Sequence, residues 1–310
     1  MRLRPRMRHG AVRWHRKHPR VSAHQRQDPS RTNGVLRQYT ADLNRRWRRV
    51  QRLITETVVV NDALRLAGSG ISLPVAAARA ATPFQFRSDP GGKVEDFDAW
   101  LDDMMDDVVL SVTRGPRGRI GSNARWQSVY VRASYSKGLQ HAKRELTKAK
   151  IPFSDDVVAT VFNAPVHAES LALLYGRQFN ELEGITRATS QRLGRVLTNG
   201  LAQGHGPEAI AREMRSQVKN IGMVRSRALA RTEIINSHAT ATLNRYADAG
   251  VEGVTVRAEF LTAGDDLVCP ICDGLQTGES IPLDEARGII PVHTNCRCVW
   301  LPALPVAIAA

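Results

Sequence analysis

Apolar residues recur at steps of three and four through most of the chain, and this spacing predicts helices with one buried face. The first stripe, within residues 39–67, consists of Leu43, Trp47, Val50, Ile54, Val58 and Leu64. A second stripe, from Phe97 to Val108, lies among aspartates that we assign to a solvated helix face. Residues 68–92 are rich in Gly, Pro and Ala and indicate a linker between the two helices.

The middle of the chain continues the helical spacing. Further helices are expected over residues 122–150, 155–162, 166–182, 187–203, from Pro207 onward, and over 223–248. The period then changes to two, with Val254, Val256, Ala258 and Phe260 on one side. This alternation predicts a strand, and a closing strand is expected at residues 298–301.

All four cysteines lie near one histidine toward the C-terminus. The candidate metal ligands are Cys269, Cys272, His293, Cys296 and Cys298. A Cys-x2-Cys turn aims two sulfurs at one ion, and tetrahedral zinc takes four such donors. We expect Cys269 and Cys272 to bind with two of the other three, which leaves one candidate outside the site. A zinc ion with four protein ligands is structural; the alternative is a reduced or disulfide-linked cluster.

The positive charge is concentrated at the N-terminus. Residues 1–52 contain 16 Lys and Arg against two Asp, which accounts for the whole formal net charge of +14. Such an arm is typical of a segment that binds nucleic acid, although a solvated tail that aids solubility is the alternative. The candidate phosphate-binding residues are Arg2, Arg4, Arg6, Arg8, Arg13, Arg16, Lys17, Arg20, Arg45, Arg46, Arg48, Arg49 and Arg52.

Several classes of protein are disfavoured by the sequence. No segment approaches the roughly 20 apolar residues that a membrane helix needs, and the arginine-rich start has no apolar core of a secretory signal. His167-Ala168-Glu169 with the later Cys-x2-Cys has elements of the zinc deaminase signature, but the two parts are far apart and Val268 precedes the first cysteine. We therefore expect neither a membrane protein nor a deaminase.

The predicted fold is mainly α with a small C-terminal β/zinc-binding module (α+β) and a disordered basic N-terminal arm. The expected divisions are a basic arm (1–38), N-terminal helices and linker (39–118), a helical body (119–250), a strand plus Cys/His module (251–304) and a tail (305–310).

One ordered set of segments resembles a known family. It runs from Ala-Leu-Ala-Arg-Thr-Glu at residues 228–233, through a strand, to Asp-Asp-Leu-Val-Cys-Pro-Ile-Cys at 265–272 and Pro-Val-His-Thr-Asn-Cys-Arg-Cys at 291–298. This order resembles the phage Mu F-like minor head proteins, also called phage head morphogenesis proteins, over roughly residues 155–304. The resemblance implies a minor capsid protein at the portal vertex and inner head of a tailed virus, without enzyme activity.

The resemblance also implies partners. They are the portal protein and the major capsid or scaffold proteins. The basic arm lies outside the region of resemblance, and its charge alone leads us to expect that it contacts packaged DNA. The expected locations are the head interior at the portal vertex and, during assembly, the host cytoplasm. The alternatives are a free zinc-containing nucleic-acid-binding protein and, with less support, a zinc-dependent hydrolase.

The Arg-Thr-Glu segment contains two charged residues whose role is open. Arg231 and Glu233 are two positions apart, so they lie on different faces of a helix. We expect a structural role, in which separate salt bridges anchor this helix to the zinc module. A catalytic pair is the alternative, but no nucleophile or base accompanies it.

Overall fold

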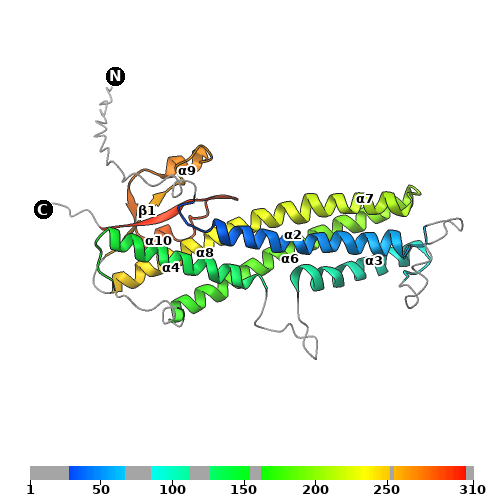
Figure 1. The fold of residues 1–310 in the computed structure, drawn as a ribbon, viewed down its shortest axis with the longest axis horizontal. Coiled ribbons are helices and arrows are strands. Elements are labelled where there is room, and N and C mark those ends of the chain that lie inside the picture. The colour runs from blue at the N-terminus through cyan, green and yellow to red at the C-terminus, as the bar shows by residue number, and fades with distance from the viewer. Residues whose placement is uncertain are drawn as a thin grey trace, which may run out of the picture.

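The computed structural model describes residues 28–66, 85–111, 126–153, 162, 164–251 and 255–304. The molecule is elongated, with helices along its length and a small sheet at one end (Figure 1). The helices are α2 (Asn33–Thr55), α3 (Pro90–Met105), α4 (Ser128–Lys148), α6 (Pro165–Ala202), α7 (Pro207–Gln217), α8 (Val224–Val251), α9 (Pro270–Leu275) and α10 (Leu283–Ala286). Wider π-type turns extend three of them, at Glu56–Val60 (η1), Asp106–Leu110 (η3) and Val218–Met223 (η4). The mainly helical class with a small C-terminal sheet is confirmed.

Helix α2 begins earlier than predicted. It starts at Asn33, so residues 33–38 are helical and not disordered. The cause is Asp28, whose carboxylate accepts hydrogen bonds from the backbone N–H of Thr32 at 3.2 Å and of Asn33 at 2.8 Å. These bonds satisfy N–H groups that have no partner within a helix. Val35 is then buried, which extends the apolar stripe by two turns.

The two helices expected over residues 166–182 and 187–203 form one continuous helix, α6. Leu182, Thr186 and Thr189 are all buried, so the buried stripe runs through the expected break without interruption. Gly184 lies within that break, and an added Cβ there would meet nothing within 4 Å. Gly184 alone therefore does not end α6. The helix expected at 155–162 lies almost entirely outside the described residues.

The sheet is three-stranded and antiparallel, in the order β2-β1-β3. Its strands are β1 (Arg257–Leu261), β2 (Ser280–Ile281) and β3 (Val299–Ala303). Both predicted strands are present: β1 ends at Leu261 as expected but begins at Arg257, and β3 begins one residue and ends two residues later than expected. Phe260 pairs with Trp300, and their rings meet edge to face with centroids 5.6 Å apart.

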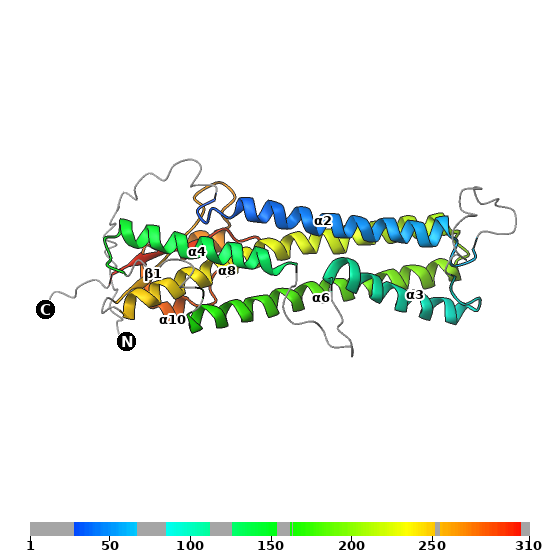
Figure 2. The ribbon, with the colours of Figure 1, turned by 60° about the horizontal axis from the view of Figure 1, so that its bottom comes forward.

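Helix α8 is the central element of the fold. Its residues belong to all three hydrophobic clusters: one within the long bundle of α2, α3, α6 and α7, one beneath the sheet, and one against α4 and α6. A close approach to α2 is at Gly222 in η4, just before α8, where an added Cβ would lie 2.7 Å from the ring of Trp47. The Trp47 indole also donates to Ser226 Oγ at 2.9 Å. Figure 2 shows α2 lying along this part of the bundle.

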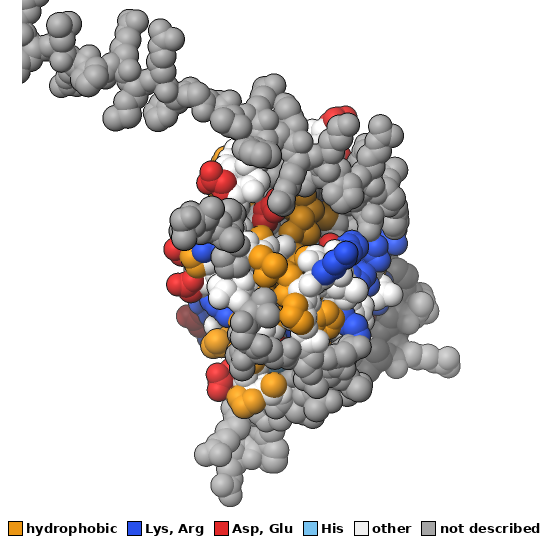
Figure 3. Space-filling model, turned by 90° about the vertical axis from the view of Figure 1, so that its left-hand side faces the viewer, with side chains coloured by type: hydrophobic (Ala, Val, Ile, Leu, Met, Phe, Trp, Pro, Cys, Tyr) orange, Lys and Arg blue, Asp and Glu red, His pale blue; other side chains and the backbone are white. Residues whose placement is uncertain are grey.

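The end that carries the sheet is mixed in character. Figure 3 shows hydrophobic side chains gathered near its middle, with most of the visible Lys and Arg on the right and acidic side chains mainly on the left. None of the helices in the described part of the chain has the length and apolar composition needed to cross a membrane.

Candidate metal centre

The Cys-x2-Cys segment forms the first turn of a short helix. Cys269 is the N-cap of α9, and its sulfur accepts a hydrogen bond from the backbone N–H of Cys272 at 3.4 Å. Pro270 occupies the first helical position, where its missing N–H is no loss. The turn therefore places both sulfurs near the same point, as a shared ion would require.

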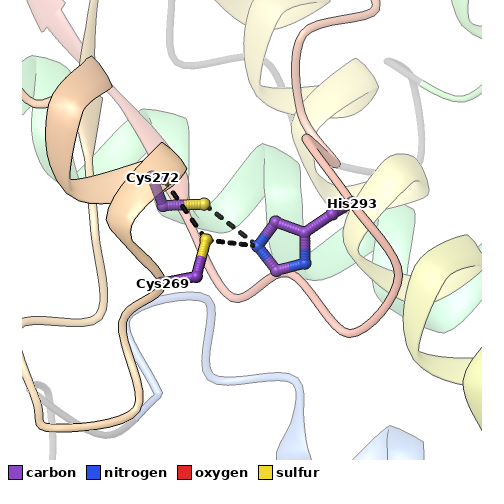
Figure 4. A group of neighbouring side chains, drawn as sticks. All are labelled: Cys269, Cys272 and His293. Atoms are coloured by element: carbon purple, nitrogen blue, oxygen red, sulfur yellow. Dashed lines mark hydrogen bonds between the residues drawn. The ribbon is translucent and has the colours of Figure 1, made fainter.

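His293 approaches these sulfurs from a separate loop. Its Nε2 lies 3.1 Å from Cys269 Sγ and 3.2 Å from Cys272 Sγ (Figure 4). Its Nδ1 lies 2.7 Å from the carbonyl oxygen of Thr294, which accepts the Nδ1 proton. This bond fixes the tautomer in which Nε2 carries a free lone pair, the arrangement typical of metal-binding histidines.

A tight turn returns the chain from His293 to the other two cysteines. Asn295 has a positive φ of 67°, and Cys296 N donates to the His293 carbonyl at 3.1 Å. Cys272, Cys296 and Cys298 then form a second group, with sulfurs within 4.8 Å of one another. All three are buried, whereas Cys269 and His293 are half-buried. Cys272 belongs to both groups, so all five predicted ligands converge around it.

The four thiols of the cluster differ in how readily they ionise. All four cysteines are free thiols. Burial raises the pKa of Cys272 to about 12, and the hydrogen bond to Cys296 together with burial raises the pKa of Cys298 further. In contrast, the hydrogen bond from Cys298 lowers the pKa of Cys296 to about 5. Several thiolates at such short separations repel one another, and a divalent cation removes that penalty. The donor set, four sulfurs and one imidazole nitrogen, fits zinc.

An ion pair that we did not predict braces the module. The guanidinium of Arg297, between the last two cysteines, binds both oxygens of Asp265, at 2.6 Å for Nη2 to Oδ1. This bond lowers the pKa of Asp265. A carboxylate held in this way is a poor general base. The pair joins positions 32 apart in sequence, and no local spacing indicates such a contact.

Glu233 has a different partner from the one predicted. It is buried, and its Oε1 pairs with Arg177 Nε of α6 at 3.2 Å, so its salt bridge runs to α6 and not to the zinc module. Burial raises the pKa of Glu233. Arg231, two residues earlier, is half-buried; burial lowers its pKa, Arg297 lowers it further, and Asp28 opposes this shift. Positions two apart lie on different faces of a helix, and of the two side chains only Arg231 is influenced electrostatically by a residue of the module, Arg297.

The candidate phosphate-binding residues divide into three sets. Those from Arg2 to Arg20 lie outside the described residues. On α2, Arg45, Arg48, Arg49 and Arg52 are exposed. Arg46 is instead engaged within the protein: its guanidinium lies 4.0 Å from the Trp126 ring centroid and donates to the Val108 carbonyl at 2.8 Å. These contacts engage Arg46 within the protein, so we do not expect it to bind phosphate. They were not apparent from the sequence around Arg46.

His167 lies away from the cysteines. It is buried, with Nδ1 2.7 Å from Tyr135 Oη and Nε2 3.0 Å from Asp248 Oδ2. The same Tyr135 hydroxyl accepts from Asn244 Nδ2 at 2.9 Å. This network joins α4, α6 and α8, so the His-Ala-Glu segment contributes to packing and not to a deaminase site.

Comparison with known proteins agrees with this C-terminal architecture. A family model described as Phage Mu protein F like protein matches residues 191–301. No curated protein and no solved structure matches the chain. The matched segment contains α7, α8, β1, β2, the start of β3 and all five candidate ligands. Residues 191–301 therefore match the Phage Mu protein F like family, which supports the resemblance found in the sequence.

Proposed function

We propose that this protein is a minor head protein of a tailed phage. It acts at the portal vertex and inner head, where it assists head assembly and DNA packaging or delivery. The observation that supports this role is the family match over residues 191–301, which covers the central helix and all five candidate metal ligands. The proposed partners are the portal protein, the major capsid or scaffold proteins, and packaged DNA. The protein would occupy the host cytoplasm during assembly and the head afterwards.

In this proposal the zinc ion has a structural role. The module has a small core, and its Cys272, Cys296 and Cys298 are themselves part of the hydrophobic cluster beneath the sheet. A metal ion would link α9 to the loop before β3 and so hold the two ends of the module together. Five donors for four positions leave no coordination site for a substrate, which is why we propose no enzyme activity.

The alternatives have less support. A zinc-dependent hydrolase needs an open metal position and a nearby general base, but Asp265 is occupied by Arg297. A nucleic-acid reader built on the zinc module would carry basic residues there. Residues 251–304 instead contain eight Asp and Glu against three Arg, and this acidic balance disfavours contact with phosphates.

The role can be tested in the phage that encodes this chain. A nonsense mutation in the gene, complemented from a plasmid, should give defective or non-infectious heads that recover with the plasmid. In purified wild-type heads, crosslinking with mass spectrometry should connect this protein to the portal. Normal infectious particles that lack the protein would refute the proposal. A parallel assay of Asp265→Asn and Asp266→Asn for particle yield and for hydrolysis separates the structural role from an enzymatic one.

A further inference from the structure

A groove of about 520 Å³ lies between α2 and α7, toward the end of the bundle that is far from the sheet (Figure 1). Its lining residues are Arg48, Gln51, Arg52, Thr55, Glu56, Val60 and Arg215. The lining contains three arginines and one glutamate, so the groove carries a net positive charge. Its charge is therefore opposite to that of the Cys/His module at the other end of the molecule.

Arg215 is held across the groove by contacts with α2. Its guanidinium Nη1 donates to Thr55 Oγ1 at 2.9 Å, and its carbonyl accepts from Gln51 Nε2 at 2.9 Å. An arginine side chain has five N–H donors, and among the described residues this bond engages one of them. Arg215 is thus oriented in advance while most of its donors stay available, which lowers the entropy lost on binding a ligand.

Arg48 and Arg52 form the α2 side of the groove. They are exposed and four residues apart, the spacing at which like charges on a helix repel. Neither has an acidic partner within 4 Å among the described residues, whereas Arg45 on the same helix is paired with Asp42. The helix therefore keeps an unfavourable pair of charges beside a third arginine, and an anion between them would offset that repulsion.

The geometry points to a phosphate-binding groove, in which Arg48, Arg52 and Arg215 hold the phosphodiester backbone of duplex DNA. Arginine forks match phosphate oxygens with two parallel hydrogen bonds. Contacts to the backbone position a protein on DNA without reading its sequence. Arg48 and Arg52 belong to the basic segment 1–52, and Arg215 of α7 adds a phosphate ligand from a distant part of the sequence, so this contact is built into the folded bundle. The inference rests on the proposed function only for the choice of DNA as the phosphate-bearing partner.

The test measures binding of the full-length chain to a mixed-sequence duplex by fluorescence anisotropy at several salt concentrations. The triple variant Arg48→Gln, Arg52→Gln, Arg215→Gln removes three charges from the groove. Each lost phosphate contact should reduce the slope of log K against log salt by about 0.9, so the slope should fall by about 2–3. The triple Arg→Lys variant keeps the charges and should keep a slope near that of the wild type.

A matched control removes the same charge elsewhere. Arg187, Arg192 and Arg195 are exposed on α6, and their triple change to Gln should leave the slope nearly unchanged. Circular dichroism and thermal unfolding establish that each variant is folded. Equal slopes for the groove and control variants would overturn the inference. So would a groove variant that loses self-association but not DNA binding, because the occupant would then be the acidic module of a second copy. A failed head-assembly role would be seen in the particle assay, and this binding measurement would be unaffected.

Discussion

His141 of α4 and His238 of α8 lie side by side in the interior, with ring centroids 5.1 Å apart. His141 Nε2 donates to the Trp300 carbonyl of β3 at 2.9 Å, so one imidazole connects a bundle helix to the sheet. The Tyr246 hydroxyl donates to the same carbonyl at 3.1 Å. Two neutral histidines therefore lie where the Cys/His module joins the helices, with the charged groups of Lys137, Arg144, Glu145 and Lys148 near them.

Stability should fall in mild acid because of this pair. Burial lowers the pKa of His141 to about 4, and burial together with His141 lowers the pKa of His238. The folded state therefore binds fewer protons than the unfolded chain, whose histidines titrate near pH ~6.5. The free energy of unfolding should decrease as the pH drops from ~6.5 toward 4, by up to about 1.4 kcal/mol per pH unit for each histidine.

Urea unfolding at pH 7.5, 6 and 5 measures this loss. His238→Leu removes one of the two groups and should make the decline shallower, whereas the exposed His205→Gln should leave it unchanged. Acid release of metal affects all three proteins alike, so the comparison isolates His238. An identical decline in His238→Leu and the wild type contradicts the assignment.

Zinc content should depend most on Cys272, since it belongs to both groups of ligands. Cys272→Ser should reduce bound zinc from about one ion per chain to almost none and lower the melting temperature. Because five donors compete for four positions, one of Cys296 and Cys298 can be dispensable. We therefore expect one of the two single variants, Cys296→Ser or Cys298→Ser, to retain the ion. Mass spectrometry of each variant, prepared under reductant, measures the number of zinc ions bound per chain. Thr294→Ala is the control, because Thr294 contacts His293 only through its backbone carbonyl. Full zinc occupancy in Cys272→Ser would rule out the site.

The Arg177–Glu233 pair predicts a second pH-dependent effect. Arg177→Ala leaves a buried carboxylate without its cation and should cost about 1–3 kcal/mol at neutral pH. Burial already raises the pKa of Glu233, so stability from this group is present at low pH and lost as the pH rises through its folded pKa. The deficit of Arg177→Ala should therefore be smaller at pH 5 than at pH 8.

Two variants separate this effect from general damage. Glu233→Gln in the Arg177→Ala background removes the buried charge and should recover most of the lost stability. Arg187→Ala breaks an exposed pair with Glu183 and should change stability by less than about 0.5 kcal/mol. A deficit in Arg177→Ala that does not vary with pH would mean that lost packing, and not the Glu233 charge, is responsible.

The sequence predicted the helices well because their buried faces follow a simple spacing. Trp47, Val50 and Ile54 are all fully buried, as their stripe requires. It also predicted which five side chains gather, since soft ligands at short spacing have few other uses. It could not predict the partners of Arg46 or Glu233, because those contacts join α2 to Trp126 and α8 to α6 across the fold. Periodicity shows that a residue faces inward, but not which residue it meets.

Two glycine variants should have opposite effects on stability. Gly222→Ala would place a Cβ 2.7 Å from the Trp47 ring and should destabilise the protein by about 1–3 kcal/mol. Gly184→Ala in α6 meets nothing within 4 Å and should stabilise it by about 0.5–1 kcal/mol. Thermal unfolding of both variants measures the difference. A neutral Gly222→Ala would show that α2 does not rest on η4 as closely as described.

The position of α8 has a consequence for how this domain can be inherited. The family match starts at residue 191, in the middle of α6, and omits α2 and α4, which cover two faces of α8. A gene segment limited to residues 191–301 would encode α8 without the helices that cover its apolar faces. It would also lack Trp47, whose ring packs against Gly222. We therefore expect recombination between genomes to preserve a folded protein when the exchanged segment includes α2 and α4. The other route is a recipient gene that encodes helices able to cover the same faces of α8.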